Sequence, residues 1–256
     1  MSRIQKAFEN KKAFIAFLTA GDPSLDKTEE YILEMERAGA DLIEIGIPFS
    51  DPIAEGLVIQ EADIRALSGG VTTDDIFDMV KKLREKTEIP LVFMTYLNPV
   101  FHYGYEAFFE RCQDVGIDGI IIPDLPFEEK EEFLPVCRRY GVELISLIAP
   151  TSKDRIAMIA READGFLYVV SSLGVTGARS EIKTDLASMM ETVRQNTHIP
   201  AAIGFGISTP EQAKRMAELA DGVIVGSTIV KLLEQHGKDA PGCIGAYVKT
   251  MKDAIR

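Results

Sequence analysis

Long apolar runs, clusters of basic residues and paired cysteines are all missing from this chain of 256 residues. No stretch approaches the ~20 consecutive apolar residues of a membrane span, and the first residues, MSRIQKAFENKK, lack the apolar core of a signal peptide. The three cysteines form no CxxC pair and none adjoins a histidine, which is typical of reduced cysteines in a cytosolic enzyme. We therefore expect a cytoplasmic protein.

Basic charge is also scarce. The 28 Lys and Arg residues face 40 Asp and Glu residues, which gives a net charge of −12, and no basic run occurs anywhere. Nucleic acids and anionic membranes attract clustered Lys and Arg, so neither is an expected partner. A small molecule that carries phosphate is not excluded, because backbone N–H groups hold phosphate without net positive charge.

What the chain does contain is a regular alternation of short apolar runs with longer amphipathic stretches. The runs are continuous in hydrophobicity, as expected of parallel strands that are covered by helices. The eight runs are Phe14–Thr19, Leu42–Ile47, Leu91–Tyr96, Gly119–Ile122, Leu144–Ile148, Phe166–Val170, Ala201–Gly204 and Gly222–Val225. Helical patterns lie between them at Leu25–Ala38, Thr73–Thr87, Tyr105–Val115, Glu129–Tyr140, Lys153–Ala163, Leu186–Asn196 and Pro210–Leu219.

Eight strand–helix units predict an α/β fold, a single (β/α)8 TIM barrel. No proline- or serine-rich linker divides the chain, so residues 1–256 are expected to form one domain. Two connections are longer than a helix requires. The one from Pro48 to Thr72 contains an extra amphipathic segment, Leu57–Leu67, and the one from Ser171 to Lys183 is rich in Gly and Ser. Long loops at the carboxyl ends of barrel strands are typical of lids and partner contacts.

Glu44 is the first candidate for chemistry, because it lies inside the second predicted strand. Leu42, Glu44 and Gly46 share one face by the strand period of two. If that face points into the barrel, the carboxyl group is buried. A structural salt bridge is the alternative, but no predicted strand contains Lys or Arg. Desolvation should then raise the pKa of Glu44 and suit it to general acid/base catalysis. Glu143, at the start of the fifth strand, is expected at the opposite end of the barrel in a structural role.

The same strands argue against two other mechanisms of carbon–carbon cleavage. A Schiff-base aldolase needs a lysine on the barrel wall, and no strand supplies one. A zinc aldolase needs clustered histidines, whereas His102, His198 and His236 are scattered. Cleavage of a carbon–carbon bond would therefore depend on carboxylates, without a metal ion.

Glycine pairs at the ends of the last two strands predict a phosphate site. Gly204-Phe205-Gly206 follows the seventh strand, and Gly226-Ser227 ends the eighth, before a helical pattern at Thr228–Gln235. Loops after strands 7 and 8 of such barrels commonly bind phosphate through backbone N–H groups. Tight turns are the alternative reading of these glycines.

Two further features would complete a binding site for an aromatic substrate. The segment Gly174–Arg179 has glycines on either side of Thr176 and could close as a lid, or be only a turn. Aromatic residues near strand ends could line a flat pocket, although each could equally belong to the core. They are Phe17, Tyr96, Tyr168 and Phe205.

The segment Glu44–Gly56, EIGIPFSDPIAEG, closely resembles the signature of the tryptophan synthase α family. Further matches follow in the same order along the whole chain. They are Thr19–Pro23, Tyr96–Pro99, Pro123–Pro126, Ser172–Gly177, Gly204–Ser208 and Gly226-Ser227. The resemblance implies a reversible retro-aldol cleavage of indole-3-glycerol phosphate to indole and glyceraldehyde 3-phosphate, with no cofactor in this chain.

The resemblance also implies roles for individual residues. Glu44 matches the glutamate that delivers a proton to the released indole carbon. Glu55 matches the second catalytic carboxylate, and Thr176 matches the lid threonine that orders it. The indole pocket and lid would include Phe17, Tyr96, Asp124, Tyr168, Thr176 and Phe205, and the phosphate site would include Gly177, Gly206, Gly226 and Ser227.

The partner that the resemblance implies is a tryptophan synthase β subunit in an α2β2 complex. That subunit holds pyridoxal phosphate and receives indole through a tunnel. The loops after strands 2 and 6 match the segments that contact β.

The chain departs from the family pattern at Glu55, where the family usually has Asp, and at Leu57, where proline is common. A longer side chain keeps the charge, but a displacement of ~1 Å can lower a rate roughly a hundredfold. Three other functions therefore stay open: a regulatory α-like subunit with little activity, a free-standing lyase that releases indole, and a barrel isomerase for another sugar phosphate.

Overall fold

The computed structural model describes residues 1–171, 185–204 and 206–256. Its strands are β1 (Ala13–Thr19), β2 (Leu42–Gly46), β3 (Leu91–Met94), β4 (Gly119–Ile121), β5 (Glu143–Leu144), β6 (Ser146–Ile148), β7 (Leu167–Val170), β8 (Ala201–Gly204) and β9 (Gly222–Val225). Its helices are α1 (Arg3–Ala7), α2 (Leu25–Ala38), α3 (Leu57–Ser68), α4 (Thr73–Arg84), α5 (Leu97–Tyr103), α6 (Tyr105–Val115), α7 (Leu134–Arg139), α8 (Lys153–Arg161), α9 (Leu186–Asn196), α10 (Pro210–Leu219), α11 (Ser227–His236) and α12 (Ala240–Ala254). Short 3-10 turns lie at η1 (Phe127–Glu129) and η2 (Gly237–Asp239).

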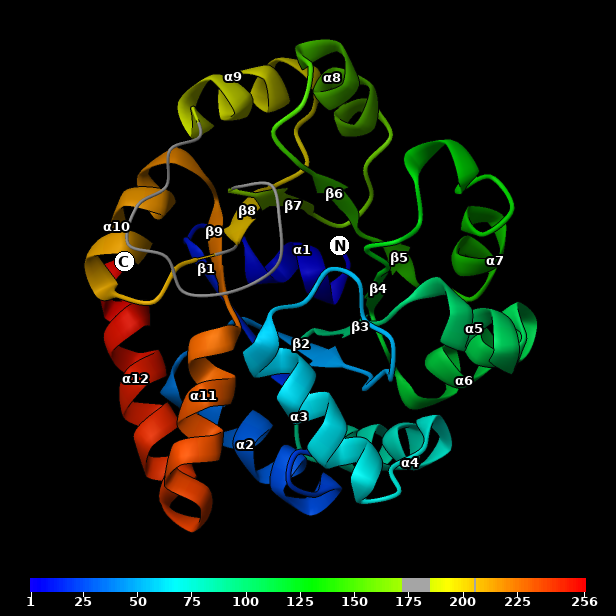
Figure 1. Ribbon diagram of the computed structural model, residues 1–256. Helices are drawn as coiled ribbons and strands as arrows, with labels where there is room; N and C mark the ends of the chain where they lie inside the picture. Colours follow the sequence, from blue (N-terminus) through cyan, green and yellow to red (C-terminus); the bar gives the residue numbers. More distant parts are fainter. Residues whose placement is uncertain (172–184, 205) are drawn as a thin grey trace.

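The strands form one parallel sheet in the order β5-β4-β3-β2-β1-β9-β8-β7-β6. Its two ends belong to one stretch of chain, because only Ile145 separates β5 from β6. The Ile145 N–H donates to the carbonyl of Ile120 at 2.9 Å, which continues the pairing with β4. Figure 1 shows the resulting ring of strands with the helices around it. The predicted barrel is therefore confirmed, and its fifth strand is divided into two short segments.

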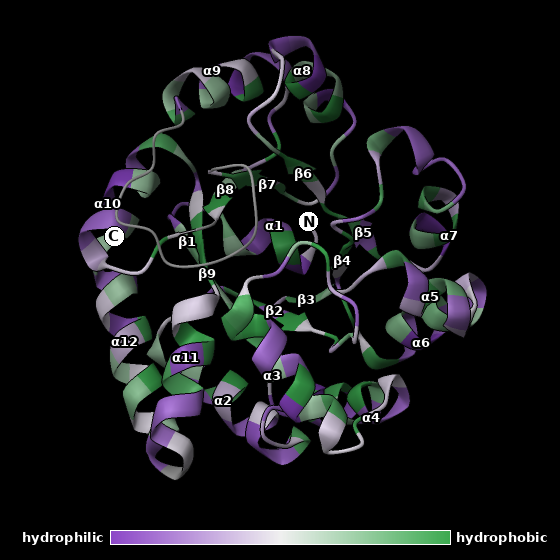
Figure 2. Ribbon diagram, in the orientation of Figure 1, coloured by the Kyte–Doolittle hydropathy of each residue, from purple (hydrophilic) through white to green (hydrophobic). Residues whose placement is uncertain are grey.

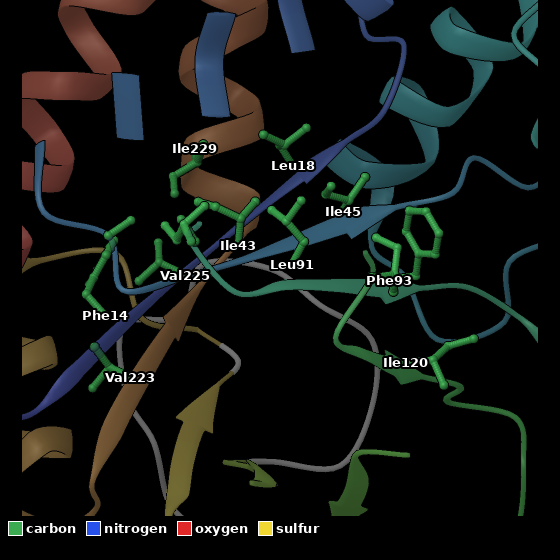
Figure 3. Close-up of a cluster of buried hydrophobic side chains, with 14 of the residues drawn as sticks. Phe14, Leu18, Ile43, Ile45, Leu91, Phe93, Ile120, Val223, Val225 and Ile229 are labelled. Atoms are coloured by element: carbon green, nitrogen blue, oxygen red, sulfur yellow. The ribbon is translucent and has the colours of Figure 1, made fainter. Parts of the chain in front are cut away.

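Side chains alternate between the inside and the outside of this ring. On β1, Phe14, Ala16 and Leu18 belong to the cluster between strands and helices, whereas Ile15 and Phe17 belong to the interior cluster. Figure 3 shows part of the outer cluster, with Phe14, Leu18 and Ile43 among its labelled side chains. Figure 2 shows the strands mainly in the hydrophobic colour and the helices in both colours. Burial on both faces explains why the strands read as continuous apolar runs.

Four helices differ from the sequence prediction. The pattern at 129–140 forms a helix only from Leu134, because Pro135 fits the first turn of a helix but not its interior. Three helices were not predicted at all: α1, α5 and α12. The last two predicted strands have the observed bounds, and the bounds of the others differ by one or two residues, as helix and strand bounds commonly do.

The long connection after β2 carries the helix that matters most for the site, α3. Arg65 anchors this helix, because its Nε and Nη2 each donate to the Asp22 carboxylate at 2.8 Å. Its Nη1 donates to Glu234 of α11 at 2.9 Å. The helix is thereby fixed against the loop after β1 and against α11, next to the barrel mouth (Figure 1).

Within the described ranges, none of the helices has the length and apolar character that a membrane crossing would need.

Candidate functional site

Glu44 lies in the middle of β2, opposite Phe17 of β1 in the strand register. Its side chain points into the barrel, as the period of two predicts, and the residue is only 1 % exposed. Neither carboxyl oxygen has a hydrogen-bond partner among the described residues. Burial raises the pKa of Glu44 from 4.5 to about 8. A carboxyl group in this state can give or take a proton near neutral pH.

Two aromatic residues of the barrel interior, Phe17 and Tyr168, are neighbours of Glu44, and glycines make room for both rings. Tyr168 of β7 is buried, and burial raises its pKa, with a further rise from the charge of Glu44. A Cβ atom at Gly204 would lie 2.5 Å from the Tyr168 hydroxyl. A Cβ atom at Gly46 would lie 2.7 Å from Cζ of Phe17. The glycines at these strand ends therefore also serve the packing of the interior aromatic rings.

Glu55 belongs to a second group of polar side chains, which lies between the loop after β2 and helix α3. The residue is 8 % exposed, although its loop is at the surface. The carboxyl group of Asp63 and the hydroxyl of Tyr96 lie near its carboxyl group, and both act on its pKa. Oε2 of Glu55 is buried and has no hydrogen-bond partner in the part of the chain that the structure describes. Burial raises the pKa of Glu55 and of Asp63, and the charge of Glu55 raises that of Asp63 further.

Tyr96 was predicted as part of an aromatic pocket, and its hydroxyl has a more specific position. It accepts a hydrogen bond from the Ala54 N–H at 3.0 Å. Its ring packs against Phe49, with 5.4 Å between the ring centroids. Tyr96 therefore connects the end of β3 to the loop that carries Glu55.

Asp124 lies half-buried in the loop after β4. Its Oδ1 accepts a hydrogen bond from the Leu97 N–H at 2.9 Å. This hydrogen bond joins the segments that follow β3 and β4. Asp124 therefore helps to hold these two segments together at this end of the barrel.

An apolar cavity of about 330 Å³ opens at the same end. Sequence reasoning missed most of the residues that line it, although their position at or next to a strand end was a usable signal. Those residues include Ala54, Met94, Ile122, Leu147 and Val170. Ala54 lines this cavity, whereas the lining includes neither Glu44 nor Glu55, and none of the described residues predicted for the indole pocket. A flat, mostly apolar ligand fits a lining of this kind.

The glycine pairs after β8 and β9 lie at two different helix starts. Helix α10 is closed by its own capping box, in which Thr209 accepts from the Gln212 N–H. Helix α11 begins after Gly226 and has no side-chain cap. The first N–H groups of a helix without a cap are free to bind an anion. Gly206 has a φ of +78°, a backbone conformation that favours glycine.

Thr176, Gly177 and Phe205 lie outside the described residues, and with them the predicted lid and part of the phosphate site. In the described ranges, no group of three or more His, Cys, Asp or Glu side chains is arranged to hold a metal ion.

Comparisons with known proteins agree with one another. A family model described as "Tryptophan synthase alpha chain" matches residues 4–255. The tryptophan synthase alpha chain of Lactiplantibacillus plantarum is 51% identical over 256 residues, which cover 100% of this chain and 97% of the relative. That of Lacticaseibacillus casei is 48% identical over 255 residues, with 100% and 96% covered.

Solved structures give the same answer. The crystal structure of the alpha chain from Legionella pneumophila superposes with a TM-score of 0.90 at 37% identity, covering 100% of this chain and 97% of that one. A structure of the tryptophan synthase a2b2 complex from Pyrococcus furiosus superposes with a TM-score of 0.87 at 36% identity, covering 94% and 98%.

Proposed function

The chain belongs to the tryptophan synthase alpha chain family, and from this premise we propose that it cleaves indole-3-glycerol phosphate to indole and glyceraldehyde 3-phosphate. The observation that carries the proposal is the buried Glu44 carboxyl group, which has no cation beside it in the described structure and a pKa raised to about 8. A pure binding module has no use for such a group.

The reaction breaks the bond between the indole C3 atom and the first carbon of the glycerol chain. The bonding electrons stay on C3, where the protonated Glu44 delivers its proton. The hydroxyl group on the first carbon of the glycerol chain loses its proton as that carbon becomes the aldehyde. The Glu44 carboxylate is then able to accept this proton. Protons and electrons balance, so a single residue that changes protonation state near neutral pH is sufficient.

Glu55 acts on the other end of the indole ring in this proposal. Protonation at C3 draws electrons from the indole nitrogen, which becomes more positive. A carboxylate that accepts a hydrogen bond from the indole N–H stabilises that charge. Its burial strengthens the interaction, because little water competes for it.

The remaining site residues bind the two ends of the substrate. Phe17, Tyr96, Tyr168 and Phe205 are proposed to pack around the indole ring, with Asp124 holding the loops of the pocket. The phosphate group is proposed to bind at Gly226 and Ser227, the start of α11, and at Gly206 and Gly177. Support comes from the missing side-chain cap of α11. Thr176 is proposed to order Glu55 when the loop around it closes.

We also propose that residues 1–256 form one cytoplasmic domain that docks on a β subunit in an α2β2 complex. The chain itself would need no cofactor, since pyridoxal phosphate belongs to the β partner. The solved Pyrococcus furiosus relative is an a2b2 complex. Exposed apolar side chains support docking around the loop after β2: Ile53 and Leu57 are each 73% exposed, and Phe101 of α5 is 67% exposed. The loop after β7, the sixth predicted strand, is the second proposed contact.

The test is indole release from indole-3-glycerol phosphate by the purified chain, with and without a matched β subunit. Slow release that rises sharply with β supports both the activity and the docking. No release in either condition, despite binding to β, contradicts the lyase and leaves the regulatory function. Release that β does not change leaves a free-standing lyase.

A further inference from the structure

Ser208 lies in the loop after β8, two residues beyond Gly206, and each polar group that it carries has a hydrogen-bond partner. Its N–H and its hydroxyl donate to Oε1 of Gln212 at 2.8 and 3.1 Å. Its carbonyl accepts a hydrogen bond from the Tyr247 hydroxyl at 3.0 Å. Side chains from two different helices, α10 and α12, therefore hold this one residue at its N–H and at its carbonyl.

The two contacts of Ser208 differ in kind. Gln212 belongs to the capping box that opens α10, and similar capping boxes open α1 and α4. A contact of that kind follows from the start of a helix and needs no function to explain it. Tyr247 lies 39 positions further along the chain, in the C-terminal helix. Its hydrogen bond is therefore a tertiary contact that ties this helix to the loop after β8.

Helix α12 is placed to reach both parts of the proposed phosphate site. It packs against α10 and against α11 (Figure 1). Gly206 precedes the first of these helices and Gly226 the second. Thr228, the second residue of α11, lies near the Tyr247 hydroxyl and acts on its pKa. Tyr247 thus contacts one of the two segments that a bound phosphate would bridge and lies near the other.

The Tyr247 hydroxyl is a lasting donor in this position. Burial raises its pKa to about 12, and the neighbouring Thr228 side chain lowers it only in part. The group therefore stays protonated at neutral pH, whereas the carbonyl of Ser208 can only accept. Gly206 has a φ of +78°, and glycine is the residue with the greatest backbone freedom. A contact from outside the loop is needed to keep N–H groups beside such a residue pointing toward one anion.

We propose that Tyr247 is a positioning residue for the phosphate site, which fixes the loop after β8 through the carbonyl of Ser208. The part of the substrate concerned is its phosphate group and not the indole ring. The inference rests on the proposed function for the place of the phosphate, whereas the hydrogen bond itself does not depend on it. Because the phosphate stays bound while the carbon–carbon bond breaks, Tyr247 contributes to substrate binding and not to the rate of the chemical step.

A binding measurement tests the inference without any activity. Inorganic phosphate and indole are titrated separately into the full chain, and NMR follows each titration. Tyr247→Phe keeps the ring and removes the hydroxyl. We expect it to raise the Kd of inorganic phosphate about three- to tenfold, the effect of one lost hydrogen bond. The Kd of indole should stay within about twofold, and circular dichroism should show an unchanged fold.

Tyr140→Phe is the matched control, because it also removes one tyrosine hydroxyl. That hydroxyl donates to Glu106 of α6 at 3.0 Å, away from the loop after β8. The control should change neither dissociation constant. Less than a threefold difference in the phosphate Kd between the two variants would overturn the proposal. An equal weakening of phosphate and indole would overturn it too, since a general loosening of the barrel affects both ligands.

Steady-state kinetics separate positioning of the phosphate loop from an effect on catalysis. Tyr247→Phe should raise KM for indole-3-glycerol phosphate by the same factor as the phosphate Kd and leave kcat within about twofold. A fall in kcat with KM unchanged would contradict the proposal. If the unchanged chain binds phosphate but releases no indole, the proposed reaction fails, while the two titrations still decide the inference. If the unchanged chain binds no phosphate, the inference fails, and indole release still decides the reaction.

Discussion

Glu44 and Phe17 lie directly opposite each other on β2 and β1, and both side chains point into the barrel. The nearest strand neighbour of the buried acid is thus an aromatic ring and not a cation. A ring offers no charge to stabilise a carboxylate, so the protonated form persists to a higher pH. The same ring lies close to Gly46 of β2 and to Gly226 at the end of β9, where an added Cβ atom would come within about 3 Å of it.

Replacing Glu44 by glutamine removes the proposed proton donor and keeps the shape of the side chain. We expect kcat for indole release to fall by about two to four orders of magnitude, the usual contribution of a positioned acid or base. Circular dichroism should show an intact fold. Glu143→Gln is the matched control, because Glu143 starts β5 at the other end of the barrel. Near-normal turnover of Glu44→Gln would exclude the proposed role.

The stability of the protein should depend on pH through Glu44. The folded state holds the proton up to about pH 8, whereas the unfolded chain releases it near 4.5. Between these values the unfolded state binds fewer protons, so the free energy of unfolding falls as pH rises. The stabilising effect of the protonated form is complete below pH 4.5 and lost on passing pH 8.

Glu44→Gln should remove this dependence and make the protein more stable than the unchanged chain at pH 9, by an amount on the order of a few kcal/mol. Urea unfolding at several pH values measures it. The same slope in both proteins would mean that Glu44 is ionised in the folded state.

Gly46→Ala should disturb the aromatic ring next to Glu44. The new Cβ atom would lie 2.7 Å from Cζ and 2.9 Å from Cε2 of Phe17, so the ring has to move. Overpacking of this kind costs about 1–3 kcal/mol, and we expect kcat to fall with it. Gly242→Ala is the control: its Cβ atom meets nothing within 4 Å, and it lies inside α12. That variant should gain up to about 1 kcal/mol, since alanine favours helix. Equal stability of the two variants would contradict the packing argument.

Substituting a charged residue for one of the exposed apolar residues should weaken binding to the β subunit but leave the cleavage reaction of the isolated chain unchanged. We expect Ile53→Glu and Phe101→Glu to leave slow indole release by the isolated chain unchanged, and to weaken activation by a β subunit at least tenfold. A titration of indole release with β measures the effect. Ile64→Glu, another exposed apolar position, tests whether α3 shares the surface. Full activation of all three variants would place the β contact elsewhere.

Much of the fold was predictable because it is encoded locally. The continuous apolar runs give the strands, and the period of two gives the inward direction of Glu44. Pro135 explains why α7 begins at Leu134 and not at residue 129, because proline fits the first turn of a helix. The sequence alone could have indicated this start. The family motif around Glu44 and Glu55 marked both acids, although it says nothing of their surroundings.

The sequence by itself determined the barrel, the interior position of Glu44 and the family, since strand periodicity and a contiguous motif are properties of neighbouring residues. The tertiary structure alone decided that Asp63 faces Glu55, that Phe17 needs Gly46, and that Ile145 closes the ring against β4. These relationships join residues whose spacing in the sequence follows no helix or strand period, so no local sequence pattern reveals them. They exist because the packing of α3 and of the strands brings side chains together, and a buried acid changes its protonation only when water is excluded around it.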